Sequence, residues 1–172
     1  MTSEKRKNGN GTVDPITMSV VFHRLGTINE EMGITMMRTS RSPIFAEVHD
    51  FSCAICDWVP RIVAQVDGVP SHTASSMMAA RAIVEKFRDE MKPGDVYMIN
   101  DPYEGGTHLA DATVVKPVYY DGELLFMAIN RAHHLDVGGM VAGSYSPEAQ
   151  EIFHEGIRIP AIRIYENDEP IQ

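Results

Sequence analysis

Apolar residues near the start of this chain recur with the period of a helix. Five of them are separated by three or four positions: Val21, Leu25, Ile28, Met32 and Met36. Such spacing lines one helix face. Asp14 and Pro15 stand just before the run, where an N-cap acceptor and a proline without an N–H are both favoured. The pattern predicts a helix that begins at Pro15 and ends before Pro43, because the residue that precedes a proline avoids helical geometry.

Shorter apolar runs between turn residues predict strands. We expect strands over residues 51–57, 61–66, 95–99, 114–120, 123–129 and 157–164. A second helix is expected from Pro70 up to a stop at Pro93, and a short helix over 147–153. Asp121-Gly122 favours a type I′ turn, so the strands on either side should form a hairpin. Helices mixed with antiparallel hairpins indicate the α+β class, with a mixed, largely antiparallel sheet and packed helices.

Composition and charge narrow the class of protein. The 172 residues suffice for one domain with a core, and 24 acidic against 15 basic residues give a formal net charge of −9. This balance argues against a nucleic-acid-binding surface, which needs a basic face, and no stretch reaches the roughly 20 apolar residues of a membrane helix. Two cysteines and eleven methionines suit a reducing compartment, so we expect a cytoplasmic protein. Residues 1–12 are polar and glycine-broken and should form a disordered tail ahead of a folded region over 13–172.

Polar residues that surface solvation does not explain gather in two segments, 100–111 and 130–139. Each segment follows a predicted buried strand, and loops at strand ends are where sites concentrate. The hairpin should bring His108 and Asp111, just before its first strand, near His133, just after its second. Two imidazoles and a carboxylate suit a divalent first-row ion such as zinc, manganese or iron. The alternative is that these histidines only cap loops by hydrogen bonds.

His134 and Asp136 are the candidate catalytic residues. An imidazole titrates near neutral pH and His134 adjoins a candidate ligand, so His134 is the expected proton-transfer group. Asp136 would help to orient a ligand imidazole. The alternative is that His134 merely hydrogen-bonds Asp136.

Other features point to ordinary structure. Cys53 and Cys56 lie three apart in a predicted strand, so their side chains should face opposite ways and act as core residues, not as a zinc or redox pair. His72, near the start of a predicted helix, is explained by solvation at the helix N-terminus. The sequence contains no Gly-Lys pair and therefore no Walker A phosphate loop, so ATP binding by this chain itself is not expected.

The two polar segments carry a resemblance to a known family. They read Asn100-Asp101-Pro102-Tyr103-x-Gly105-Gly106-Thr107-His108-Leu109-x-Asp111 and Asn130-Arg131-Ala132-His133-His134-x-Asp136-Val137-Gly138-Gly139. This pattern resembles the hydantoinase B family, which includes the B half of 5-oxoprolinase and the alpha-type subunits of acetone and acetophenone carboxylases. Further matches, from Asp14-Pro15-Ile16-Thr17 to Glu155-Gly156-x-Arg158-Ile159-Pro160, extend the resemblance over about residues 13–164.

The resemblance implies one part of a multi-subunit, ATP-dependent enzyme. Family B subunits are much longer than this chain, which would be their N-terminal portion. A hydantoinase A-like ATPase subunit would hold ATP and Mg, and a separate C-terminal B-type chain would be a further partner. Acetone carboxylase holds manganese with a histidine, an aspartate three residues later and a histidine 25 after the first, which maps onto His108, Asp111 and His133. Zinc is the alternative ion, and iron is less favoured.

The function that the resemblance implies first is ketone carboxylation. The B-type subunit would help to join a small ketone and bicarbonate, activated by phosphorylation, into a 3-oxo acid. One alternative is ATP-dependent hydrolysis of a cyclic amide, as by a hydantoinase or a 5-oxoprolinase. Another is a non-catalytic assembly subunit, although retention of all three candidate ligands speaks against it.

Overall fold

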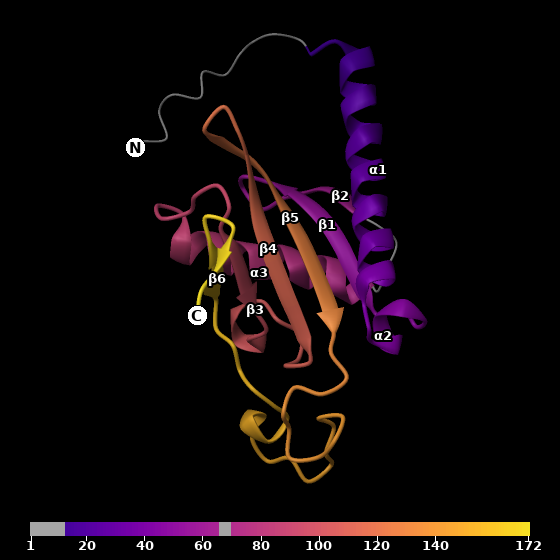
Figure 1. The fold of residues 1–172 in the computed structure, drawn as a ribbon, viewed down its shortest axis with the longest axis vertical. Helices are drawn as coiled ribbons and strands as arrows, with labels where there is room; N and C mark the ends of the chain where they lie inside the picture. Colours follow the sequence, from indigo (N-terminus) through magenta and orange to yellow (C-terminus); the bar gives the residue numbers. More distant parts are fainter. Residues whose placement is uncertain (1–12, 66–69) are drawn as a thin grey trace.

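A single antiparallel sheet organises the protein (Figure 1). The structure is a computed structural model and describes residues 13–65 and 70–172, so the tail predicted over 1–12 lies outside the described residues. Within them, neighbouring strands all pair antiparallel in the order β2-β1-β5-β4-β3-β6-β7. The strands are β1 (Phe51–Asp57), β2 (Ile62–Gln65), β3 (Val96–Ile99), β4 (Asp111–Tyr120), β5 (Glu123–His133), β6 (Ile162–Glu166) and β7 (Glu169–Pro170). The α+β prediction is confirmed.

Helices cover the two faces of this sheet (Figure 1). They are α1 (Pro15–Thr39), α2 (Pro43–Ala46) and α3 (Pro70–Phe87), with 3-10 turns η1 (Pro102–Glu104) and η2 (Ile152–His154). The predicted start of α1 is confirmed, because the Asp14 carboxylate accepts a hydrogen bond from the Thr17 amide at 3.0 Å. No helix in the described ranges combines the length and apolar character needed to cross a membrane.

The main core lies between α3 and the sheet. Its buried members on α3 are Ala79, Ala80, Ile83 and Val84, and they meet Cys56, Tyr97, Ile99, Val115, Met127 and Ile129 from four strands. A smaller cluster on the other face joins Phe45, Phe51, Cys53 and Ala132 to methionines of α1. Cys53 and Cys56 therefore point to opposite faces, as predicted, and both are free thiols. Burial raises the pKa of each thiol to about 12, which keeps it protonated and inert.

The predicted apolar face of α1 is only half used. In the second half of the helix, Asn29 and Gly33 are buried against β1, and Asn29 donates to the Cys53 carbonyl at 3.0 Å. In the first half, Ile16 is 74% exposed and Phe22 is 61% exposed. The first turns of the helix extend past the strands, whereas Phe22 borders a groove beside β2 (Figure 1). Val21, the first residue of the predicted face, is exposed as well.

The prediction of a short helix over 147–153 is wrong, because only the turn η2 forms there. Two backbone amides of the segment bond to side chains, and one of them, that of Gln150, would bond the Ser146 carbonyl in a helix. The Ser146 hydroxyl accepts from the Glu148 amide at 3.2 Å, and the His154 ring nitrogen accepts from the Gln150 amide at 3.2 Å.

The last strand lies later than predicted, over Ile162–Glu166 instead of 157–164. Asn100 explains the shift, because its backbone and side chain engage the segment before β6. Its amide donates to the Ile159 carbonyl at 3.0 Å, its Oδ1 accepts from the Ile159 amide at 2.6 Å, and its Nδ2 donates to the Ile157 carbonyl at 2.9 Å. The segment is thereby tied to a loop instead of a neighbouring strand.

Candidate metal centre

The β4–β5 hairpin places His133 directly opposite Asp111. Asp121 and Gly122 both have positive φ, as a type I′ turn requires, and the turn pairs Tyr120 with Glu123. A bulge between Val118 and Tyr119 then shifts the register by one residue, which puts His133 and not Ala132 opposite Asp111. Both strands are longer than predicted, so Asp111 begins β4 and His133 ends β5. Directly opposite residues share one face of a sheet, and the His133 Nδ1 lies 3.0 Å from the Asp111 Oδ1.

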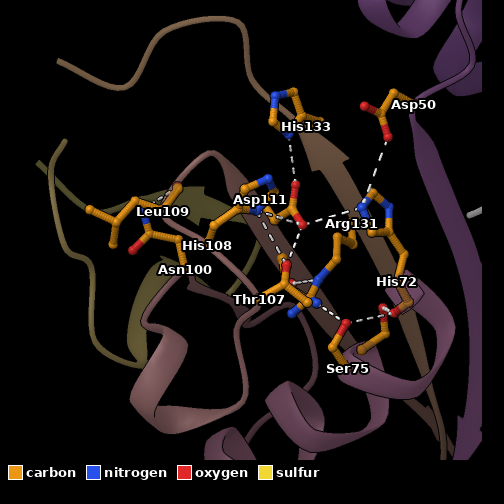
Figure 2. A network of polar contacts seen from close by, with 12 residues as sticks. Asp50, His72, Ser75, Asn100, Thr107, His108, Leu109, Asp111, Arg131 and His133 are labelled. Atoms are coloured by element: carbon orange, nitrogen blue, oxygen red, sulfur yellow. Dashed lines mark hydrogen bonds and ion pairs between the residues drawn. The ribbon is translucent and has the colours of Figure 1, made fainter. Parts of the chain in front are cut away.

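His108 reaches the same carboxylate from a tight turn (Figure 2). The Asp111 amide donates to the His108 carbonyl at 3.0 Å, and this turn brings the His108 Nδ1 to 3.0 Å from the Asp111 Oδ2. One ligand atom from each of His108, Asp111 and His133 lies within 4.8 Å of the others. The structure therefore brings together the three residues that the sequence predicted to converge.

The loop that presents His108 packs closely on α3. Gly105 has φ +105°, and a Cβ atom there would lie 2.6 Å from the Ala79 backbone nitrogen, so only glycine fits. At the base of the loop, the Asn100 side chain donates to the Leu109 carbonyl at 2.8 Å, and the buried Asp101 pairs with Arg158 at 2.6 Å. The loop is thereby held at both ends and across its middle.

Asp111 is a buried carboxylate that stays ionised. Only 1% of the residue is exposed, and burial by itself would raise its pKa. Hydrogen bonds from His108, His72 and Thr107 outweigh burial and hold its pKa well below the ordinary value. The same contact to Asp111 raises the pKa of His108, against the lowering effect of burial.

His72 is a site residue that the sequence analysis missed. Its side chain is buried, and its Nε2 lies 3.2 Å from the Asp111 Oδ2 and 3.9 Å from the Asp50 Oδ1 (Figure 2). Explaining it by solvation at the helix start was wrong. One signal could have found it: His72 precedes Ser76, Ala79 and Ile83 at spacings of four, three and four, which places it on the buried face of α3.

Arg131 ties three elements together beneath the site. It is 0% exposed, and burial lowers the pKa of its guanidinium to about 10. Its Nε donates to the Thr113 hydroxyl at 2.7 Å, Nη1 donates to the Ser75 hydroxyl, and Nη2 donates to the Gly105 carbonyl at 3.1 Å. These contacts join β5 to β4, to α3 and to the loop that carries His108 (Figure 2).

The two predicted catalytic residues lie on the chain that leaves β5. The His134 amide donates to the Ala110 carbonyl at 2.8 Å, and its ring meets the Phe45 ring edge-on at 5.4 Å between centroids. Burial and the neighbouring His133 lower its pKa. The Asp136 carboxylate accepts from the Gly138 amide at 2.8 Å and, more distantly, from the Gly143 amide and the Ser144 hydroxyl. Both catalytic assignments stay predictions.

The three converging residues fit a divalent metal ion. Two imidazoles and one ionised carboxylate are the donor set that zinc, manganese and iron accept. The side chains of His108 and His133 are 35% and 17% exposed, so the cluster is reachable from solvent. The Tyr145 ring, 6.3 Å from the His133 ring and 6.1 Å from the His108 ring, borders it.

Several known proteins are similar to this chain in sequence. The chain is 42% identical over 154 residues to caprolactamase subunit beta of Pseudomonas jessenii, and the match covers 90% of this chain and 26% of that protein. It is 41% identical over 157 residues to a 5-oxoprolinase of Pestalotiopsis fici, covering 91% of this chain and 12% of that protein. The chain thus spans about a quarter or less of the length of these relatives.

Two solved structures share the fold of this chain. An ATP-dependent caprolactamase from Pseudomonas jessenii matches with a TM-score of 0.86 and 40% identity, over 93% of this chain and 28% of that one. A nucleotide-free acetone carboxylase matches with a TM-score of 0.84 over 92% of this chain and 21% of that one, but at 20% identity it shows the fold alone. The family model described as hydantoinase B/oxoprolinase matches residues 14–172. On that match, the chain belongs to the hydantoinase B/oxoprolinase family.

Proposed function

We propose that this chain is the metal-binding, N-terminal portion of a B-type subunit in an ATP-dependent hydrolase of cyclic amides. The observation that carries the proposal is the convergence of His108, Asp111 and His133 within 4.8 Å. The relatives at about 40% identity are a caprolactamase subunit and a 5-oxoprolinase, both named for cyclic amides. These relatives favour the cyclic-amide alternative over ketone carboxylation, whose representative is 20% identical.

The proposed role of this chain in the reaction follows from its three candidate metal ligands. A divalent ion held by the three residues would act as a Lewis acid on the carbonyl oxygen of the amide or of its activated form. Asp111 would supply the negative charge that attracts the ion, and Thr107 helps to keep that carboxylate ionised by donating to it. His108 must release its proton to become a ligand, because only a neutral imidazole offers a lone pair.

His134 is the proposed proton-transfer group. Its lowered pKa favours the neutral ring, which can accept a proton, and it directly follows a proposed ligand. The proposed role of Asp136 is to hold the loop beside that ring, since its carboxylate binds two amides of its own loop. His134→Ala should lower turnover with the metal still bound, and Asp136→Asn should lower it less.

The proposed partners follow from the share of the relatives that this chain spans. A hydantoinase A-like subunit would bring ATP and Mg. The remainder of the B-type polypeptide, in the same or a separate chain, would complete the site. Its docking on the exposed apolar turns of α1 would remove Ile16 and Phe22 from water. A cytoplasmic location stays part of the proposal.

The assembled enzyme tests this function. Co-expression with the A-type subunit should give a complex that contains one divalent ion per B-type chain by elemental analysis. With ATP, the complex should open a lactam such as caprolactam or 5-oxoproline and should leave acetone unchanged. Carboxylation of acetone without lactam hydrolysis would overturn the substrate class. An active complex without stoichiometric metal would overturn the metal centre.

A further inference from the structure

The buried imidazole of His72 is not used by the ligand set described above. It lies on α3, far in sequence from the hairpin, and is 4% exposed. Its Nε2 is 3.2 Å from the Asp111 Oδ2, whereas the His133 Nδ1 contacts the other oxygen, Oδ1. Its own Nδ1 is buried with no hydrogen-bond partner among the described residues. Burying an unpaired ring nitrogen costs free energy, which the contact of Nε2 with Asp111 at 3.2 Å and its approach to Asp50 at 3.9 Å offset.

The partners of His72 identify its tautomer. A carboxylate only accepts hydrogen bonds, so the nitrogen that faces Asp111 must carry the proton. With the proton on Nε2, the buried Nδ1 is left with only a lone pair unpaired. The other tautomer would bury an unpaired N–H donor and turn a lone pair toward the carboxylate, which is worse on both counts.

The position of His72 is itself held by the arginine beneath the site. Arg131 donates to the Ser75 hydroxyl, and Ser75 in turn donates to the His72 carbonyl at 3.2 Å. The Ser76 hydroxyl donates to the same carbonyl at 2.6 Å. This chain of contacts, visible in Figure 2, locks the turn of α3 that carries His72 to strand β5.

We propose that His72 is a positioning residue that donates Nε2–H to the Asp111 Oδ2 and so holds the carboxylate ready for the metal ion. The inference rests on the proposed metal centre. Partners of this kind orient a ligand and keep it ionised, and their loss weakens metal binding by roughly 10- to 100-fold. His72 contacts Oδ2 from α3, whereas His133 contacts Oδ1 from the neighbouring strand β5.

Metal affinity of the full chain tests the role. Zinc binding is measured by competition with a chromophoric chelator, and Co²⁺ absorption reports ligand geometry. His72→Leu, which cannot donate, should bind zinc roughly 10- to 100-fold more weakly and show an altered Co²⁺ spectrum. His72→Gln, whose amide can donate from near the Nε2 position, should recover most of the affinity. His23→Leu, an exposed histidine of α1, is the matched control and should bind like the parent chain.

A second measurement uses the metal-free parent chain, so its result does not depend on whether a variant folds. Long-range ¹H–¹⁵N spectra of the metal-free parent chain should show His72 with its proton on Nε2. A ring with its only proton on Nδ1, or zinc affinity in His72→Leu within a factor of about three of the parent, would overturn the role of His72. A parent chain that binds no stoichiometric zinc, manganese or cobalt would instead overturn the metal centre, and with it this role.

Discussion

Two regions of the molecule reverse the usual distribution of polar and apolar residues. At the end of the sheet where β4 begins, Asp111 and Arg131 are buried, although charged residues are seldom buried. In the first turns of α1, Ile16 and Phe22 are exposed, although large apolar residues favour the core. In the first region both charged groups find their hydrogen-bond partners within this chain. The second is left exposed by the described residues, and we propose that it docks the rest of the B-type polypeptide.

The two buried charges of the polar region are stabilised by several hydrogen bonds each. Arg131 has three oxygen acceptors, and Asp111 has four hydrogen-bonding neighbours in His72, Thr107, His108 and His133. Inside a protein such a network is rigid, since each lost contact leaves a buried group unpaired. Rigidity is what a metal site requires of its ligands.

The exposed apolar region has no such compensation. From Pro15 to Phe22 the helix carries no charged residue, and apolar side chains lie all around it. A helix that is apolar on every side is normally buried. The relatives are more than three times as long as this chain, so most of their polypeptide lies outside the region matched here. Substitutions in the buried polar region and in the first turns of α1 can test this contrast.

The largest effect is expected from Arg131→Met. The change leaves the acceptors on Ser75, Thr113 and Gly105 without their donor, and we expect a loss of about 3 kcal/mol in the free energy of unfolding. Urea denaturation measures it. The exposed Arg61, replaced in the same way, should cost less than about 0.5 kcal/mol. Equal losses for the two arginines would refute a special role for the buried network.

The second largest effect is expected from Asp111→Asn. The amide keeps the shape of the side chain but removes the charge that attracts the ion, so zinc affinity should fall by more than about 100-fold. Titration calorimetry measures the affinity. Asp136→Asn is the control carboxylate, and its zinc affinity should stay within a few-fold of the parent chain. A strong loss in that control would show that the loop after β5 belongs to the ligand set.

The metal-free network should stabilise the fold only within a pH window. Asp111 has a lowered pKa, so its contribution is present above about pH 4 and is lost as pH falls through the folded-state value. His108 has a raised pKa, so its contribution is present below about pH 6.5 and is lost as pH rises through the folded-state value. In chelator, the parent chain should therefore exceed Asp111→Asn in unfolding free energy by more at about pH 5.5 than at about pH 8. The opposite trend would contradict the assignment.

The smallest effect on the isolated chain is expected in α1. Replacing Ile16 and Phe22 together by serine should change the free energy of unfolding by no more than about 0.5 kcal/mol, because both side chains are already in water. The same double variant should fail to assemble with the rest of the enzyme, as measured by size-exclusion chromatography. For comparison, Ile83→Ala in the core should cost about 2–5 kcal/mol. A destabilised α1 variant would mean that these turns pack within the chain.

Local chemistry in the sequence determined much of this protein. Asp14 and Pro15 set the start of α1, the run from Phe51 to Asp57 matched β1 residue for residue, and Asp121-Gly122 set the hairpin turn. That turn made the approach of His108, Asp111 and His133 predictable, because antiparallel pairing returns the chain to its starting point. The bulge that puts His133 directly opposite Asp111 was not predicted. These features depend on residues close in sequence or on a single short connection.

Only the tertiary structure decided the rest. The conformation of the segment before β6 is set by Asn100, more than fifty residues earlier. The Asn100 side chain bonds to backbone groups that a strand would have paired with a neighbouring strand. His72 faces Asp111 because α3 packs across the sheet, and no local pattern states which strand lies under a helix turn. The exposure of α1 likewise depends on what lies beside it and not on its own apolar period. In each case the deciding partner is distant in sequence, and spacing along the chain carries no information about it.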